Sequence, residues 1–285
     1  MLNILMVGDV VGASGRRAVA QLLPQLREEY SLDLVVVNAE NADGLGLFIN
    51  SAKELLQVGA DILTLGDHIY DKMEIYHYLA QNDRIVRPLN FSPHTPGHYQ
   101  SIVKVKGVRV MVVSVIGLLK INMYSASSPF AAMDELLNHL ETVRTEEQPQ
   151  IMLVDFHAED IREKHALAWH LDGKVSAVVG THTHVPTLDA RILPQGTGKV
   201  TDLGMCGPRD SSLGMTLESA LTRFVQGMPS MYQIAPGPVQ FNSLFMKIDE
   251  ESGRCLHLER VDRVLKNLER PESDEDLQHE EIRRL

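Results

Sequence analysis

Five short segments of the chain place metal-binding side chains at the ends of apolar runs. The pentapeptide Gly180-Thr181-His182-Thr183-His184 follows the apolar run 175–179 and puts two imidazoles two residues apart. Neutral imidazoles at this spacing can ligate one metal ion or two adjacent ions. A single His-x-His pair is weak evidence, because either ring could instead be a hydrogen-bonded loop histidine. The metal hypothesis therefore depends on whether the arrangement recurs.

The arrangement recurs at four other places. The residues at the ends of these apolar runs are Asp9, Glu40 with Asn41, Asp67 with His68, and His157. Each has an ordinary structural interpretation when taken alone, since a strand-end Asp often caps a helix, Asn often occupies a turn and His often lies hydrogen-bonded in a core. Five such places in one chain favour a shared metal centre.

The mixture of side chains indicates the kind of metal. Carboxylate, amide and imidazole ligands together suit Fe, Mn, Zn or Co, whereas calcium would be expected to use oxygen ligands alone. The candidates outnumber the ligands that one ion requires, and a carboxylate such as Glu40 can bridge. Two ions roughly 3.5–4 Å apart would activate a water and clamp a phosphate.

The elements that must position these residues follow from the hydrophobic pattern. Short apolar runs alternate with helical periodicity in the first third of the chain: strands at 2–7, 34–37 and 62–65, and helices at about 14–29, from 51 and at about 72–80. We expect Ser14 to cap the first helix, and the capping-box spacing of Ser51 and Glu54 to begin the second. The alternation predicts a largely parallel sheet with right-handed crossovers. Loops at the carboxyl ends of its strands would meet around one site.

The rest of the chain is less regular. The expected elements are a hairpin of 99–105 and 108–115, helices at 129–143, 161–169 and 217–224, buried strands at 151–154 and 175–179, and a hairpin of 240–248 and 255–261. We expect one domain over 1–265 and a charged C-terminal tail, 266–285, that is a loose helix or disordered.

Composition excludes several classes of protein. The chain has 285 residues, 44% of them hydrophobic, and a formal net charge of -11, which argues against stable binding of nucleic acid but not of a small nucleotide held through metal ions. Its two cysteines, Cys206 and Cys255, form no Cys-x-x-Cys pair, and Cys206 is expected in a turn. We expect neither a signal peptide nor a membrane span, because the N-terminal run lacks a basic start and no apolar run approaches the length of a membrane span. These features predict a cytoplasmic protein without a membrane partner.

The chemistry-bearing segments, taken together, resemble the calcineurin-like metallophosphoesterases, and more narrowly the bacterial YmdB-type family. They are Gly8-Asp9, Asn38-Ala39-Glu40-Asn41, Gly66-Asp67-His68, Asp155-Phe156-His157-Ala158-Glu159 and Gly180-Thr181-His182-Thr183-His184. Supporting stretches include Val86-Arg87-Pro88, Arg191-Ile192-Leu193-Pro194 and Thr201-Asp202-Leu203-Gly204-Met205. The resemblance covers roughly residues 1 to 265.

The resemblance implies a fold, a cofactor and an activity. The fold is α/β, a four-layer αββα sandwich of the metallo-dependent phosphatase type, with two mixed sheets flanked by helices. The cofactor is a pair of divalent or mixed-valence transition-metal ions, iron first and manganese or zinc as alternatives. The activity is hydrolysis of phosphodiesters, with 2′,3′-cyclic nucleotides as substrates, by attack of a metal-bound hydroxide. The partner would be a small nucleotide or phosphodiester, and a homo-oligomer is compatible with the family.

The resemblance also assigns roles to residues. One ion would be held by Asp9, Glu40, Asn41 and His184. The other would be held by Glu40, Asp67, His157 and His182, with Glu40 bridging. His68 would donate a proton to the leaving oxygen.

Two positions depart from the family pattern. Asp67 stands where the family has Asn, and Gly117-Leu118 stands where the family has Gly-Arg. The first adds negative charge to the metal site, and the second removes a cation expected near it. These departures motivate an alternative hypothesis, a regulatory or interaction protein that retains the metallophosphoesterase shell with weak or lost catalysis.

Overall fold

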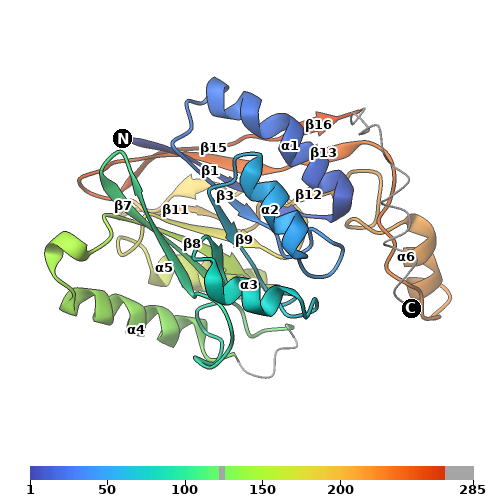
Figure 1. Ribbon diagram of the computed structural model, residues 1–285, viewed down its shortest axis with the longest axis horizontal. Helices are drawn as coiled ribbons and strands as arrows, with labels where there is room; N and C mark the ends of the chain where they lie inside the picture. Colours follow the sequence, from blue (N-terminus) through green and yellow to red (C-terminus); the bar gives the residue numbers. More distant parts are fainter. Residues whose placement is uncertain (122–125, 267–285) are drawn as a thin grey trace.

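Two six-stranded sheets packed face to face form the centre of the molecule, as the computed structural model in Figure 1 shows for residues 1–121 and 126–266. The first sheet has the order β15-β14-β1-β3-β4-β5. Its strands are β1 (Leu2–Val7), β3 (Leu34–Asn38), β4 (Ile62–Thr64), β5 (Ile85–Val86), β14 (Ser243–Ile248) and β15 (Cys255–Arg260). The strands β1, β3, β4 and β5 are parallel, and β14 and β15 run antiparallel at one edge.

The second sheet has the order β10-β11-β9-β8-β7-β6. Its strands are β6 (Gln100–Val105), β7 (Val108–Ile116), β8 (Ile151–His157), β9 (Ala177–Thr181), β10 (Arg191–Ile192) and β11 (Gly198–Val200). The four central strands are parallel, and the expected hairpin of β6 and β7 forms one edge. Both large sheets are therefore mixed, as predicted.

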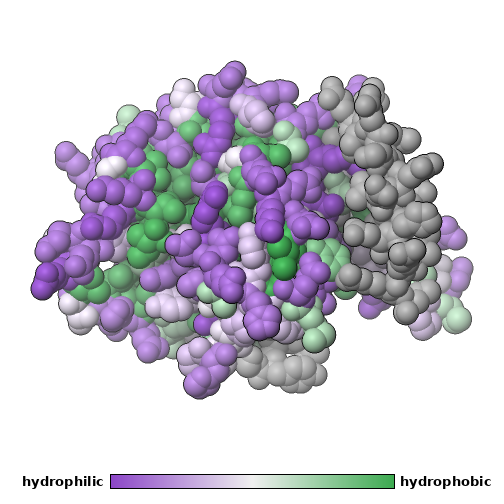
Figure 2. Space-filling view, viewed as in Figure 1, coloured by the Kyte–Doolittle hydropathy of each residue, from purple (hydrophilic) through white to green (hydrophobic). Residues whose placement is uncertain are grey.

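Helices cover the outer face of each large sheet. The first sheet carries α1 (Gly12–Glu29), α2 (Ile49–Gln57) and α3 (Ile75–Gln81), and the second carries α4 (Pro129–Thr142) and α5 (Ile161–His170). A short 3-10 helix, η1 (Thr145–Glu147), follows α4, and α6 (Leu217–Phe224) projects from the side of the sandwich. Figure 2 shows mainly hydrophilic residues on the face toward the viewer, with hydrophobic residues visible between them. The layers follow the order αββα, which confirms the predicted fold class.

Side-chain alternation along β1 produces this layering. Ile4 and Met6 point into the core between the sheets, whereas Leu5 and Val7 pack against the helices. Full burial of one such side chain stabilises the fold by about 1.5–3 kcal/mol. A slip of one residue would bring Asn3 into the core between the sheets, so the register is strongly determined.

A third, smaller sheet was not expected from the sequence. Its order is β16-β13-β12-β2, and its strands are β2 (Asp9–Val10), β12 (Met205–Pro208), β13 (Val239–Phe241) and β16 (Arg263–Leu265). The expected strand 240–248 is interrupted at Asn242, whose carbonyl accepts from the amide of Gly8 at 3.0 Å, because the chain leaves one sheet there and enters another. The expected hairpin is present as β14 and β15. The expected turn at Cys206 is wrong, because Cys206 lies buried in β12.

Both predicted helix caps are wrong. The first helix begins at Gly12, which has a φ of 63°, so Ser14 lies inside its first turn with a buried hydroxyl that has no hydrogen-bond partner. The second helix begins at Ile49 without a side-chain cap. The Ser51 hydroxyl instead donates to Asp43 at 2.8 Å. The Ser51 hydroxyl, which a capping box would use at the start of the helix, is therefore bonded to Asp43 outside the helix.

Two further expectations concern membrane-spanning segments and the C-terminal tail. Within residues 1–121 and 126–266, no helix is long and apolar enough to cross a membrane. The C-terminal tail beyond residue 266 lies outside the described residues, and the single-domain organisation stays a prediction.

Candidate metal centre

The predicted ligands lie where the strand ends of the two large sheets converge. Asp9 is in β2 immediately after β1, Glu40 and Asn41 follow β3, and Asp67 follows β4 by a short segment. On the second sheet, His157 is the last residue of β8, and the two other histidines follow β9. The packing of the two sheets brings these edges together.

Four of the predicted ligands form a tight cluster. One donor atom from each of Glu40, Asp67, His157 and His182 lies within 4.8 Å of the others. His157 Nε2 is 3.0 Å from Glu40 Oε1, 2.9 Å from Asp67 Oδ1 and 2.9 Å from His182 Nδ1. Glu40 and His157 are buried, whereas the side chains of Asp67 and His182 are 18% and 21% exposed. The cluster is therefore buried on the side of Glu40 and His157 and partly exposed on the side of Asp67 and His182.

The other three predicted ligands lie around this cluster. Asp9 is fully buried, and its carboxylate oxygens accept from the His182 amide at 3.2 Å. Asn41 Nδ2 donates to Glu40 Oε1 at 2.6 Å. His184 Nδ1 donates to the Leu213 carbonyl at 3.0 Å, which leaves Nε2 free for a metal. The role of these three residues as ligands, and the division of all seven between two ions, stay predictions.

A buried hydrogen-bond chain fixes the orientation of His157. The Thr181 hydroxyl donates to Asp155 Oδ1 at 2.6 Å and lies 2.9 Å from His157 Nδ1. Since its one hydrogen is used on Asp155, the hydroxyl must accept from Nδ1–H. Asn38 and Thr64 also donate to Asp155. His157 Nε2 therefore points at Glu40, Asp67 and His182, the orientation that a metal ligand needs.

The charges of the site call for a cation among these atoms. Burial raises the pKa of Asp9 to about 7, and the Asp202 and Glu40 carboxylates add to this against the opposing effect of His157. Burial acts to lower the pKa of His157, but Glu40 and Asp67 outweigh it and raise that pKa well above its ordinary value. The carboxylates thus favour a positive charge at His157 Nε2, which a proton or a metal ion can supply. The residues present fit a transition-metal centre.

His68 occupies a different position from the other histidines. Its Nδ1 lies 2.9 Å from Asp71 Oδ2, its Nε2 lies 3.6 Å from Asp67 Oδ2, and its side chain is 29% exposed. Burial lowers its pKa, but Glu40, Asp67 and Asp71 raise it above the ordinary value overall. A protonated imidazole at the open side of the cluster fits the predicted proton donor.

The departure at Leu118 leaves an ordered loop. The amides of Leu118 and Leu119 donate to the buried Glu163 carboxylate at 3.0 and 3.2 Å, and Leu118 is 39% exposed. Lys120 lies close by, with its Nζ 3.2 Å from Asp160. The backbone of the loop is therefore held by Glu163, and Leu118 places no cation at the position where the resemblance led us to expect one.

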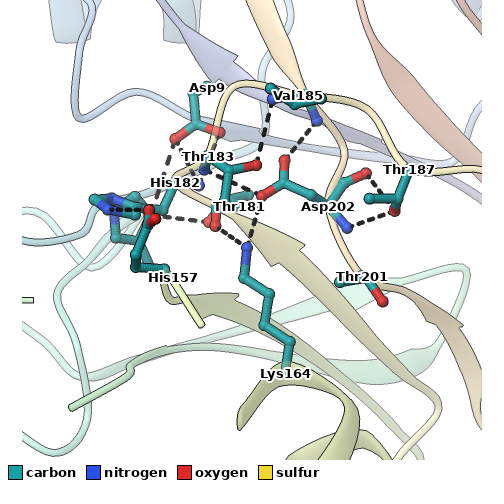
Figure 3. Close-up of polar contacts among 12 residues, drawn as sticks. Asp9, His157, Lys164, Thr181, His182, Thr183, Val185, Thr187, Thr201 and Asp202 are labelled. Carbon is teal, nitrogen blue, oxygen red and sulfur yellow. Dashed lines mark hydrogen bonds and ion pairs between the residues drawn. The ribbon is translucent and has the colours of Figure 1, made fainter. Parts of the chain in front are cut away.

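Sequence reasoning assigned no role to several residues that support the site, although Asp155, Thr181 and Asp202 stand in the quoted motifs. Asp155 and Thr181 orient His157, and Lys164 and Asp202 hold the segment that carries His182 (Figure 3). Asp155 could have been found as a carboxylate inside a buried strand. Lys164 could have been found as a charge on the apolar face of a helix, one turn from Leu167.

The fold and this cluster define a class, the metallophosphoesterases. Residues 5–261 match the family described as YmdB-like protein, and the chain belongs to that family. It is 38% identical over 261 residues to the 2′,3′-cyclic-nucleotide 2′-phosphodiesterase of Bacillus subtilis, an alignment covering 91% of this chain and 96% of that protein.

Two solved structures agree with this assignment. A hypothetical protein from Thermus thermophilus has a TM-score of 0.83 at 39% identity, covering 92% of this chain and 99% of that one. A novel phosphatase from Mycoplasma pneumoniae has a TM-score of 0.86 at 29% identity, covering 93% of this chain and 94% of that one. The family resemblance read from the motifs is confirmed.

Proposed function

We propose that this protein is a di-metal phosphodiesterase whose substrates are 2′,3′-cyclic nucleotides. The observation that carries the proposal is the convergence of Glu40, Asp67, His157 and His182 at the strand ends. The Bacillus subtilis relative, named for hydrolysis of 2′,3′-cyclic nucleotides, supports the substrate class.

The residues of the site divide into ligands and a proton donor. Asp9, Glu40, Asn41 and His184 would hold one ion, and Glu40, Asp67, His157 and His182 the other. When bound, such ions activate water and stabilise charge on the phosphoryl oxygens. Iron is our first choice, with manganese or zinc as alternatives, since mixed nitrogen and oxygen donors suit all three.

His68 performs the proton transfer in this proposal. Asp71 accepts the Nδ1 hydrogen and so fixes the ring, which leaves Nε2 to carry the mobile proton toward the leaving oxygen. Glu40 and His157 are buried, whereas Asp67, His182 and His68 are partly exposed, so a substrate would approach from the side on which these three residues lie. Such a site suits a small phosphodiester.

We place the protein in the cytoplasm. Cys206 and Cys255 are free thiols, and both are buried. Burial raises the pKa of Cys255 to about 12 and keeps it in the unreactive thiol form. This use of cysteine fits a reducing compartment.

A substrate panel tests the proposal. Protein reconstituted anaerobically with Fe²⁺, and separately with Mn²⁺ or Zn²⁺, should hydrolyse 2′,3′-cyclic mononucleotides faster than linear diesters, and linear diesters faster than monoesters. Glu40→Gln, which weakens the shared ligand, is the control and should lose both metal and turnover. Metal-loaded protein that hydrolyses none of these compounds would favour the regulatory hypothesis instead.

A further inference from the structure

Lys164 and Asp202 form a buried ion pair beside residues 181–184, the histidine loop, which carries His182 and His184. Lys164 Nζ lies 2.6 Å from Asp202 Oδ2, and the two side chains are 2% and 1% exposed. Lys164 belongs to α5 and Asp202 follows β11, so both come from outside that loop (Figure 3). Enclosed charges are costly unless they are paired and fully hydrogen-bonded. Their remaining hydrogen bonds therefore show what the pair holds in place.

Each side chain makes one hydrogen bond to the backbone of the histidine loop, and Asp202 Oδ1 also accepts from the Gly204 amide at 2.7 Å. Lys164 Nζ donates to the Thr181 carbonyl at 2.7 Å, and Asp202 Oδ2 accepts from the Thr183 amide at 3.1 Å. Asp9 accepts from the intervening amide, that of His182, at 3.2 Å. Three successive residues thus each have a backbone group bound to a charged side chain (Figure 3). Bonds to charged groups are stronger than those between neutral groups, so the backbone here has little freedom to rotate.

The conformation of the loop needs such restraint. His182 has a φ of 97° and His184 a φ of 64°, in the region that residues with a side chain seldom occupy. Backbone of this kind persists only where the surrounding structure determines it strongly. A return to negative φ at either residue would turn its imidazole away from its present direction.

Gly180 allows close packing beside the Lys164 side chain and the residue before Asp202. A side chain at Gly180 would place its Cβ in overlap with the Thr201 carbonyl oxygen and 3.2 Å from Lys164 Cδ. Glycine therefore lets β9 approach both the chain before Asp202 and the lysine stem. The Asp202 backbone also exchanges two hydrogen bonds with Thr187, at 2.9 and 3.1 Å. These bonds fix the segment that follows His184.

We propose that Lys164 and Asp202 are positioning residues that hold His182 and His184 in their metal-binding conformation and so set the metal affinity of the centre. The inference rests on the proposed function only in that the centre binds metal. Loss of partners that orient metal ligands typically lowers metal affinity about 10–100-fold. A pair that served stability alone would leave metal affinity unchanged in a folded variant.

A double-mutant cycle separates these roles. Lys164→Met and Asp202→Asn each leave one enclosed charge without its partner, and we expect each to lose stability and metal affinity. The variant carrying both changes removes both charges, so its metal-free stability toward urea should recover toward wild type. Its affinity for Co²⁺, measured by competition with a chelator, should remain about 10–100-fold below wild type, with an altered visible spectrum of the bound Co²⁺.

Lys199→Met is the matched control. Lys199 is similarly enclosed, with a 1% exposed side chain, but its Nζ binds Asp189 at 2.7 Å rather than the histidine loop. This control should lose stability and keep wild-type Co²⁺ affinity. Wild-type affinity in the double variant, or an equal loss of affinity in Lys199→Met, would overturn the inference. Failure of the wild-type protein to bind Co²⁺ would instead contradict the proposed function.

Discussion

His68 differs from the other histidines of the site by what its two nitrogens contact. Nδ1 is held by Asp71, and Nε2 lies at the open side of the cluster, 3.6 Å from Asp67. In His157, by contrast, Nε2 faces Glu40 and Asp67 at 3.0 and 2.9 Å, and the side chain is buried. These contacts are the reason that we propose His68 as a proton donor and His157 as a metal ligand.

His68→Ala should keep the metal and lose turnover. General acid catalysis contributes typically about 10²–10⁴-fold, so the turnover number should fall by a factor in that range. The loss should be smaller for substrates whose leaving group needs no proton. Metal content and turnover measured on the same sample check this, with His139→Ala, an exposed histidine on α4, as the control. A variant that loses one metal ion would show that His68 is a ligand.

Asp67 adds a third carboxylate to those of Asp9 and Glu40. Its side chain contacts His157 at 2.9 Å and His182 at 3.3 Å, so it lies within the cluster rather than beside it. Extra negative charge should bind the metals more firmly, reduce their Lewis acidity and repel the substrate phosphate. Asp67→Asn should therefore raise turnover near neutral pH and make the metals easier to remove with a chelator. Lower activity at every pH with both metals still bound would mean that the site is adjusted to Asp67.

At the scale of elements, the segment after β4 shows how closely the strand ends approach each other. A Cβ at Gly66 would overlap with both Glu40 Oε2 and His157 Nε2. Only glycine lets this backbone pass between the first sheet's carboxylate and the second sheet's imidazole. The glycine in Gly66-Asp67-His68 therefore belongs to the candidate metal site, although it offers no ligand.

Gly66→Ala should displace Glu40 or His157 and lower metal affinity, while the protein still folds. Chelator competition measures the affinity, and urea unfolding measures the stability. Gly107→Ala is the control, because its Cβ would meet no atom within 4 Å and its φ of 92° would make the change strained but remote. If Gly66→Ala binds metal as tightly as wild type, the two sheets adjust to each other more easily than the structure indicates.

The elements that sequence reasoning found are those with long, regular patterns. The alternation of strands and helices predicted β1, β3, β4 and the helices after them because burial on both strand faces produces continuous apolar runs. Helix starts were mispredicted because Ser51 is bonded to Asp43, a residue outside its helix. The short strands of the third sheet have two to four residues and leave too little pattern to recognise.

More of the candidate site could be predicted from the sequence than of the local structure that supports it. Metal-binding side chains at strand ends are visible in the sequence, and parallel strands bring such ends together. The Lys164–Asp202 pair could not be predicted, because its two members are 38 residues apart and meet only when α5 packs behind β9. Positive φ at His182 and His184 is likewise a property of the folded loop.

At the scale of the whole molecule, the geometry of the candidate metal centre depends on the core between the sheets. Hydrophobic residues of both sheets form one buried cluster, which sets the distance between their strand ends. That distance puts Glu40 and Asp67 from the first sheet against His157 and His182 from the second. The candidate metal centre is thus a product of sheet packing, with its clustered side chains contributed by both sheets.

Turnover measured against metal content tests the central claim most directly. Metal-free protein is titrated anaerobically with Fe²⁺, and hydrolysis of a 2′,3′-cyclic nucleotide is followed together with the metal bound per chain. Turnover should be absent without metal, rise as metal binds, reach its maximum near about two ions per chain and disappear on chelation. Protein that holds its full complement of metal and hydrolyses no phosphodiester, or that binds no metal at all, would contradict this account.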